Sequence, residues 1–338
     1  MRIAILTGGG DAPGLNATIR AIVRRAEEYG WEVIGIRWGW KGMLDGEYIS
    51  LEYDEIEEII REGGTILGTS RVNPLKRKDG LEKIKENFKK LRIDALIAIG
   101  GNDTLSVAKE LHKMGLPVIG VPKTIDFDLT TTEYTIGFHT AVHVATEALD
   151  RIVTTAKSHG RIFVVEVMGR YSGWIALYAG VAAGAHYIAI PEAPLNVDEI
   201  IKVIENRWKK GKNYAIIVIA EGVRIKGHYK EEVIDEFGNV KVGGVAEILA
   251  KIIKEKTGIE TRHIVLGHLV RGGTPVALDR FISTQYGYLA VELIKEKMFG
   301  KMPAIVNGKL TAVPIEDGIK GLRKVNGNLY EFAKSFFV

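Results

Sequence analysis

Residues 95–129 constrain most strongly what this chain can fold into. Two apolar runs in this stretch, 95–99 and 117–121, have the composition of buried β-strands, and each ends in a turn crowded with polar residues. The first turn, 100–104, opens a helix, and the second, 123–128, opens a loop. Because ligands gather at the carboxyl ends of strands in parallel sheets, the two turns predict a site at one sheet edge.

The residue types in these two turns favour phosphate and divalent-metal chemistry. Paired glycines let backbone N–H groups approach an anion, and the N-terminus of the following helix adds positive potential. Thr124, Asp126 and Asp128 alternate after Lys123, so an extended segment would place their side chains on one face. The alternative is a pair of ordinary solvated loops.

Composition excludes several classes of protein. The 338 residues suffice for two domains, and the net charge of +4 comes from interspersed rather than clustered basic residues, which disfavours a nucleic-acid partner. No apolar run approaches ~20 residues, so no membrane partner is expected. There is no cysteine, and the N-terminus reads as a strand entering a glycine turn rather than a signal peptide. A cytoplasmic enzyme is expected.

Strand-like and helix-like patterns alternate along the whole chain, which predicts an α/β fold with mostly parallel sheets. A polar segment at 226–241 is expected to form a loop or hairpin. The first strand, turn and helix resemble a dinucleotide-binding unit, but Pro13 occupies the third glycine position and no acidic residue ends the next strand. A nicotinamide cofactor is therefore disfavoured, whereas the glycine turn remains a suitable phosphate cradle.

Several predicted strand tips carry groups suited to phosphoryl transfer, a reaction that depends on positioning and charge stabilisation. These groups are Gly10, Arg71, Asp103, Lys123, Arg170 and Arg271. Arg161, Arg262, His268 and Arg271 could bind a phosphate that is not transferred, and Glu221 could accept sugar hydroxyls. His268 could equally be a capping or core histidine, and Arg262 part of a surface ion pair.

The chain also resembles the 6-phosphofructokinase family over essentially its whole length. The motifs that carry the resemblance are GGGDAPGLN (8–16), GGTILGTSR (63–71), GGNDT (100–104), PKTIDFD (122–128), IGFHTA (136–141), VVEVMGR (164–170), AEG (220–222) and LGHLVRGGTP (266–275). The GGNDT turn alone is weak, because NAD kinases and diacylglycerol kinases carry a similar one. The PKTID and GHLVRGG elements distinguish the family.

The resemblance implies roles for individual residues. Asp126 would take the proton from the C1 hydroxyl of fructose 6-phosphate, with Asp128 beside it and Lys123 near the transferring group. Thr124, Met168, Gly169, Arg170 and Glu221 would hold the sugar or the transferring group, and His268 and Arg271 the 6-phosphate. Gly10, Arg71, Gly101, Asn102, Asp103 and Thr104 would hold the phosphoryl donor with its Mg²⁺, and Asn102 is the candidate metal ligand.

The resemblance further implies two Rossmann-like three-layer lobes with the active site in the cleft between them. Residues 1–138 plus 252–302 would bind the donor, and residues 139–251 plus 303–338 the sugar phosphate. Arg161 and Arg262 would reach the site from a neighbouring subunit, which predicts a homo-oligomer, either a dimer or a tetramer.

The donor is predicted to be pyrophosphate, with ATP as the alternative. Asp103 stands where ATP-dependent relatives carry glycine, and its carboxylate would repel the α-phosphate of ATP. Four further departures from the family pattern concern donor choice, rate or metal binding: Asn102 replaces an acidic residue, Phe127 an asparagine, His139 an aspartate and Tyr171 a histidine. They leave open a weakly active regulatory paralogue, and a kinase of another sugar phosphate is the remaining alternative.

Overall fold

The computed structural model describes residues 1–227 and 243–338, which divide into two compact units. Unit 1 comprises Met1–Ile125, Leu129–Thr140 and Arg271–Leu322, and unit 2 comprises Asp126–Asp128, Ala141–Val270 and Arg323–Val338. The polar segment expected at 226–241 lies almost entirely outside the described residues. No helix within the described residues has the length and apolar character needed to cross a lipid bilayer.

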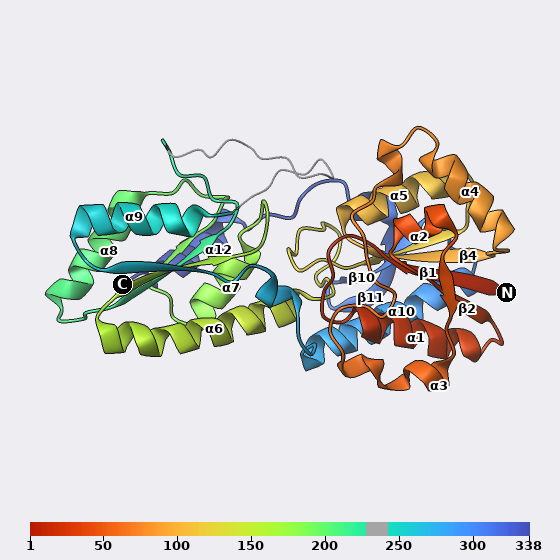
Figure 1. The fold of residues 1–338 in the computed structure, drawn as a ribbon, viewed down its shortest axis with the longest axis horizontal. Helices are drawn as coiled ribbons and strands as arrows, with labels where there is room; N and C mark the ends of the chain where they lie inside the picture. The colour runs from red at the N-terminus through yellow and green to blue at the C-terminus, as the bar shows by residue number, and fades with distance from the viewer. Residues whose placement is uncertain (228–242) are drawn as a thin grey trace. The chain divides into compact units, whose positions relative to one another are not determined.

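Unit 1 is built on a five-stranded sheet with the order β3-β2-β1-β4-β5 (Figure 1). Its strands are β1 (Arg2–Thr7), β2 (Glu32–Ile36), β3 (Tyr48–Ser50), β4 (Ala95–Gly100) and β5 (Val118–Pro122). All neighbours are parallel except β2 and β3, which pair antiparallel. The alternation of strands and helices that the sequence predicted is thus confirmed, with a short antiparallel strand added at one edge.

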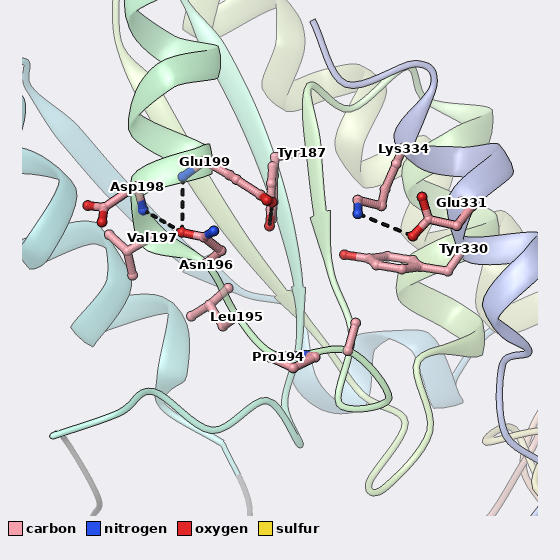
Figure 2. A pocket seen from close by; sticks show the side chains of 11 residues that line it. Tyr187, Pro194, Leu195, Asn196, Val197, Asp198, Glu199, Tyr330, Glu331 and Lys334 are labelled. Carbon is pink, nitrogen blue, oxygen red and sulfur yellow. Dashed lines mark hydrogen bonds and ion pairs between the residues drawn. The ribbon is translucent and has the colours of Figure 1, made fainter.

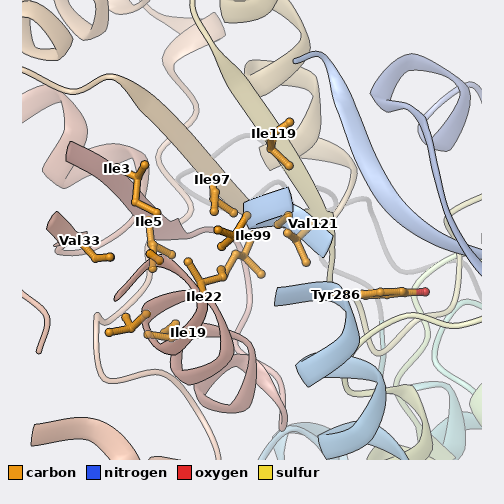
Figure 3. Packing of buried hydrophobic residues seen from close by; sticks show 14 of the residues in the cluster. Ile3, Ile5, Ile19, Ile22, Val33, Ile97, Ile99, Ile119, Val121 and Tyr286 are labelled. Carbon is orange, nitrogen blue, oxygen red and sulfur yellow. The ribbon is translucent and has the colours of Figure 1, made fainter. Parts of the chain in front are cut away.

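Both faces of this sheet are covered, which explains why its strands are apolar throughout. Residues alternate between the faces, so Ile3 and Ile5 belong to one buried cluster and Ala4 and Leu6 to another. Figure 3 shows the first cluster, in which Ile97 and Ile99 of β4 lie with residues from the helices, including Tyr286. The three-layer arrangement predicted for this lobe is confirmed.

The helices of unit 1 supply these two covering layers. The first layer contains α1 and α10, which pack against each other, and the second contains α2, α4 and α5. Their bounds, with those of the shorter helices, are α1 (Leu15–Glu27), α2 (Trp40–Asp45), α3 (Tyr53–Ile56), η1 (Glu57–Arg61), η2 (Pro74–Lys76), α4 (Gly80–Lys90), α5 (Asn102–Lys113), α10 (Ala277–Lys295) and α11 (Ile315–Gly318). An antiparallel hairpin of β10 (Lys301–Val306) and β11 (Lys309–Pro314) packs beside β5.

Unit 2 contains a four-stranded, wholly parallel sheet with the order β7-β8-β6-β9. The strands are β6 (Ile162–Val167), β7 (Tyr187–Ala189), β8 (Ala215–Ala220) and β9 (Thr261–Val265). The helices are α6 (Phe138–His159), α7 (Trp174–Ala182), α8 (Val197–Lys209), α9 (Val245–Thr257), η3 (Gly267–Arg271) and α12 (Gly327–Lys334). Helix α9 packs on β6 and β9, and α7 packs on β7 and β8.

The division into units differs from the predicted lobes, 1–138 plus 252–302 and 139–251 plus 303–338, in two long segments, and also in residues 126–128, which belong to unit 2, and residues 139–140, which belong to unit 1. Residues 252–270 belong to unit 2, because β9 pairs with β6 in its sheet. Residues 303–322 belong to unit 1, because the β10–β11 hairpin and α11 pack against β5. The observed division therefore assigns both segments to the other unit than the sequence-based boundaries did.

Candidate functional site

The predicted site residues of unit 1 follow the carboxyl ends of three neighbouring strands. Strand β1 lies between β2 and β4, so the chain order reverses there, and ligands in such sheets bind beside this switch point. The turns after β1, β4 and β5 contain Gly10, the 101–104 residues and Lys123 respectively. Gly9 N–H also donates to Ser70 O (3.1 Å), which brings the turn before Arg71 beside the first glycine turn.

Lys123 places a buried ammonium group directly at this glycine turn. Its side chain is 3% exposed, and Nζ donates to Gly8 O at 3.0 Å and to Gly10 O. Thr124, next along the chain, is also buried, and its carbonyl accepts from Thr135 Oγ1 (2.8 Å). A cation fixed below a turn of N–H donors favours an anionic ligand at that turn.

The side chain of Thr104 explains why two neighbouring positions, Gly8 and Gly100, are glycine. Its side chain is buried, and a Cβ added to Gly8 would come within 2.5 Å of Thr104 Oγ1. A Cβ added to Gly100 would lie 2.3 Å from Thr104 Cβ, so both backbones approach α5 more closely than an alanine permits. Asn102 is half-buried and Asp103 exposed, both in the first turn of α5.

Arg271 lies beside the first glycine turn within unit 1. Its guanidinium donates to Asp11 O (3.0 Å), and a Cβ added to Gly10 would lie 2.6 Å from Arg271 Nη1. The residue predicted to hold a sugar phosphate is thus close to the turn predicted to hold the donor. Arg71 is exposed.

Residues 126–128, which follow directly on Lys123 and Thr124, pack within unit 2. Ser172 Oγ donates to Asp126 O (2.8 Å), and Arg323 N–H donates to Asp128 O (2.8 Å). Asp126 is 6% exposed. The two aspartates are therefore fixed through their backbones by residues distant in sequence.

Glu221 follows β8 and contacts the turn after the neighbouring strand β6. Its Oε1 accepts from Gly169 N (3.1 Å) and Arg170 N (2.9 Å), and Met168 beside them is buried. Burial raises the pKa of the Glu221 carboxyl, and the charge of Asp126 adds to this, against the lowering effect of the two N–H donors. The predicted residues of the β6 and β8 tips thus form one cluster with Asp126.

Arg161 and Arg262 do not join this cluster. Arg161 directly precedes β6, and Arg262 is the second residue of the neighbouring edge strand β9, so both lie near the amino ends of their strands. Six residues of strand span about 20 Å, which separates Arg161 from Arg170 within one chain. Arg262 is exposed and pairs with Glu260 (2.9 Å), while His268 is exposed in η3.

Sequence reasoning missed Glu166, a carboxylate buried within β6. Its side chain is 2% exposed and accepts from Gly244 N (2.9 Å) and Ala246 N (3.0 Å), so it caps the N-terminus of α9. A lone acidic residue inside the apolar run IFVVEV was the available signal, because a buried charge requires partners. Ser172, which donates to the carbonyl of Asp126, was also missed, because nothing in its sequence context indicated a buried contact.

Unit 2 also has a cavity of about 580 Å³ apart from these clusters (Figure 2). Its lining includes Tyr187, Asn196, Glu199, Tyr330 and Lys334 and none of the predicted site residues. Asn196 Oδ1 accepts from the N–H groups that open α8, and Tyr330 donates to Ile188 O (2.8 Å). These polar groups therefore already serve the fold.

Comparisons with known proteins agree with the motifs. Residues 2–294 match the family described as Phosphofructokinase. A pyrophosphate--fructose 6-phosphate 1-phosphotransferase of Amycolatopsis methanolica is 51% identical, covering 100% of both chains. The ATP-dependent 6-phosphofructokinase 3 of Streptomyces coelicolor is 47% identical, covering 99% of each.

A solved structure shares the architecture as well. The pyrophosphate-dependent phosphofructokinase from Marinobacter aquaeolei aligns with a TM-score of 0.82 at 25% identity, covering 100% of this chain and 92% of its own. Sequence and fold thus agree over the full length of the chain. The chain belongs to the phosphofructokinase family.

Proposed function

We propose that this protein transfers a phosphoryl group from pyrophosphate to the C1 hydroxyl of fructose 6-phosphate. The products are fructose 1,6-bisphosphate and orthophosphate. The family assignment supports the reaction class, and the relative from Amycolatopsis methanolica carries the name of this activity. The observation that carries the proposal is the buried Lys123 ammonium at the Gly8 and Gly10 carbonyls, within the turn that would receive the donor.

Asp103 supports pyrophosphate over ATP. A glycine turn at a helix N-terminus attracts anions, but Asp103 puts its own negative charge into the first turn of α5. A donor with a third phosphoryl group would bring another negative charge toward this carboxylate. Pyrophosphate is shorter and avoids that repulsion, while Lys123 stabilises its charge.

In the proposed reaction, Asp126 accepts the proton of the C1 hydroxyl as its oxygen attacks the terminal phosphorus of pyrophosphate. A new P–O bond forms at C1, the bridging P–O bond breaks, and orthophosphate leaves. Lys123 and Arg170 stabilise the negative charge on the transferring group, and Asp128 completes the acidic pair.

The remaining site residues bind the two substrates. Gly10, Arg71, Gly101, Asn102, Asp103 and Thr104 are proposed to surround the donor, with Thr104 acting through packing. Thr124, Met168, Gly169, Arg170 and Glu221 are proposed to contact the sugar, and His268 and Arg271 its 6-phosphate. Arg271 beside Gly10 also adds positive charge near the donor turn.

The donor set fits Mg²⁺ as the accompanying cation. Within the described residues, no group of three or more His, Cys, Asp or Glu side chains is arranged to hold a metal. Mg²⁺ commonly keeps several waters and binds one or two protein oxygens together with substrate phosphates. Asn102 would supply an amide oxygen, and the bound ion would neutralise charge on the phosphates.

Arg161 and Arg262 support a homo-oligomeric enzyme. Both lie near the amino ends of neighbouring strands, about 20 Å along β6 from Arg170, so within one chain they cannot join that cluster. A second copy could present them to it, as a dimer or tetramer.

ATP remains the second candidate donor, because a relative 47% identical is named as ATP-dependent. The test is one paired assay of the purified protein with fructose 6-phosphate and saturating Mg²⁺, comparing pyrophosphate with ATP. A higher kcat/KM for pyrophosphate is expected, and a preference for ATP would contradict the Asp103 argument. Turnover of neither donor would favour a regulatory paralogue or a kinase of another sugar phosphate.

Two variants sharpen this assay. Asp103→Gly should shift the ratio of kcat/KM values toward ATP by about tenfold, because a like charge is removed. Lys123→Gly should reduce the pyrophosphate reaction more than the ATP reaction. The matched control is Asp198→Gly, which also removes an exposed first-turn aspartate, from α8, and should leave the ratio unchanged.

A further inference from the structure

Phe127, between the two aspartates of the proposed reaction, has an unusual backbone. Its φ is +56°, in the left-handed region that glycine and asparagine adopt readily and that bulky residues rarely enter. Strain of this kind persists only where surrounding contacts over-determine the conformation, and it is common at functional sites. Because Asp126 and Asp128 are its neighbours, the conformation of Phe127 decides the directions in which their side chains leave the backbone.

Two side chains from distant parts of unit 2 enclose the Phe127 ring. Trp174 meets it edge-on, with ring centroids 5.4 Å apart and planes at 83°. The Arg323 guanidinium carbon lies 4.0 Å from the centre of the Phe127 ring and 5.2 Å from that of Trp174. Both rings are 4% exposed, so the cation–π contacts are largely shielded from water.

The backbone contacts link the same residues. Arg323 N–H donates to Asp128 O (2.8 Å), and Trp174 Nε1 donates to Arg323 O (3.0 Å). Tryptophan thus orients the arginine, and arginine binds the segment both through the Phe127 ring and through the next carbonyl. An ordinary packing role for Phe127 would account for the ring contacts but not for the strained φ.

We propose that Trp174 and Arg323 form a clamp on Phe127 that positions the carboxylates of Asp126 and Asp128 for proton transfer. The inference rests on the proposed function for the role of the two aspartates. Trp174 and Arg323 are positioning residues, since they act through Phe127.

The test replaces Phe127 with asparagine, a residue that adopts positive φ without support from Trp174 and Arg323. Asparagine adopts the left-handed conformation readily, so Phe127→Asn should keep kcat within about threefold, whereas Phe127→Ala should lower it about tenfold. Trp174→Leu should lower kcat about tenfold in the parent, with KM for fructose 6-phosphate nearly unchanged. In the Phe127→Asn background, Trp174→Leu should change kcat less than about threefold.

Trp208→Leu, in α8, is the matched control and should leave kcat unchanged in both backgrounds. Equal losses from Trp174→Leu in the two backgrounds would overturn the proposal, as would a coupling seen in thermal stability but not in kcat. Crystal structures of the Trp174→Leu variants supply a readout independent of turnover. The clamp is supported if Trp174→Leu displaces the Asp126 and Asp128 carboxylates when residue 127 is phenylalanine but not when it is asparagine. Carboxylates that stay in place in both variants overturn it. This readout applies even if the parent protein phosphorylates no sugar.

Discussion

The predicted site residues of the two units include positions with positive φ, and unit 2 fills some of these positions with residues other than glycine. In unit 1, the positions with positive φ in the predicted glycine turns include Gly9 (+78°), Gly64 (+65°) and Gly68 (+68°). In unit 2, such positions include Gly169 (+149°) but also the non-glycine residues Phe127 (+56°) and Arg170 (+49°). Glycine enters this region without strain, whereas the other two residues need partners such as Trp174 and Glu221. The glycine turns of unit 1 should therefore be sensitive to added atoms, whereas positions 127 and 170 of unit 2 should be sensitive to the removal of their partners.

The largest expected effect comes from removing the carboxylate of Asp126, which contacts within unit 2 hold in place. Asp126→Ser should lower kcat by about 10²–10⁴-fold, because positioned proton transfer is lost. Fructose 6-phosphate should still bind with an affinity close to that of the parent, measured by calorimetry. Asp198→Ser, at an exposed position, is the control, and parent-like turnover of Asp126→Ser would show that the assigned role is wrong.

A glycine-to-alanine substitution tests whether the glycine turns of unit 1 are sensitive to added atoms. Gly8→Ala should lower the free energy of unfolding by about 1–3 kcal/mol, because the new Cβ would lie 2.5 Å from Thr104 Oγ1. Thr104→Ala in the same chain should recover part of that loss, which urea unfolding of the single and double variants would measure. Gly321→Ala, where a Cβ meets no heavy atom within 4 Å, is the control. Additive losses would contradict the packing argument.

The smallest expected effect is the pH dependence of stability that comes from His186, a buried histidine of unit 2 that accepts a backbone hydrogen bond. His186 is buried, its Nδ1 accepts from Ile216 N (2.8 Å), and burial lowers its pKa from 6.5 to about 4. The neutral form is therefore favoured in the folded protein, and its stabilisation is present above pH 6.5 and lost as the pH falls toward 4. Between pH 7 and 5.5 the loss should be about 1 kcal/mol.

Urea unfolding at these two pH values would measure the effect. His186→Asn keeps an acceptor for Ile216 N–H but does not titrate, so this part of the pH dependence should disappear. His143→Asn, at an exposed position, should leave it unchanged. An unaltered slope in His186→Asn would assign the pH dependence to other groups.

Much of the fold and part of the candidate site could be predicted from the sequence. Buried parallel strands such as β4 read as continuous apolar runs, and polar residues at their carboxyl ends must lie at one edge, where Lys123 contacts the carbonyl of Gly10. The lobe boundaries could not be predicted in the same way, because they depend on the sheet in which β9 pairs and on where the β10–β11 hairpin packs.

The clamp around Phe127 lay beyond sequence reasoning for a related reason. Phe127 departs from the pattern that the family resemblance implies, but Trp174 and Arg323 are distant from it in sequence and carry no motif. Only the folded unit 2 brings the three together. The roles assigned to Arg161 and Arg262 stay predictions, because they depend on a second copy of the chain.

The enclosed Phe127 ring has a consequence for how such a sequence can arise. A chain with asparagine between the two aspartates tolerates the left-handed backbone without help, so the tryptophan and the arginine can be acquired there at little cost to turnover. Phenylalanine that arises before both partners would, on the proposed clamp, displace the acidic pair and lower turnover. Once it is present, the loss of either partner is penalised. The clamp therefore favours one order of these changes, and the reversal that costs least turnover begins at position 127.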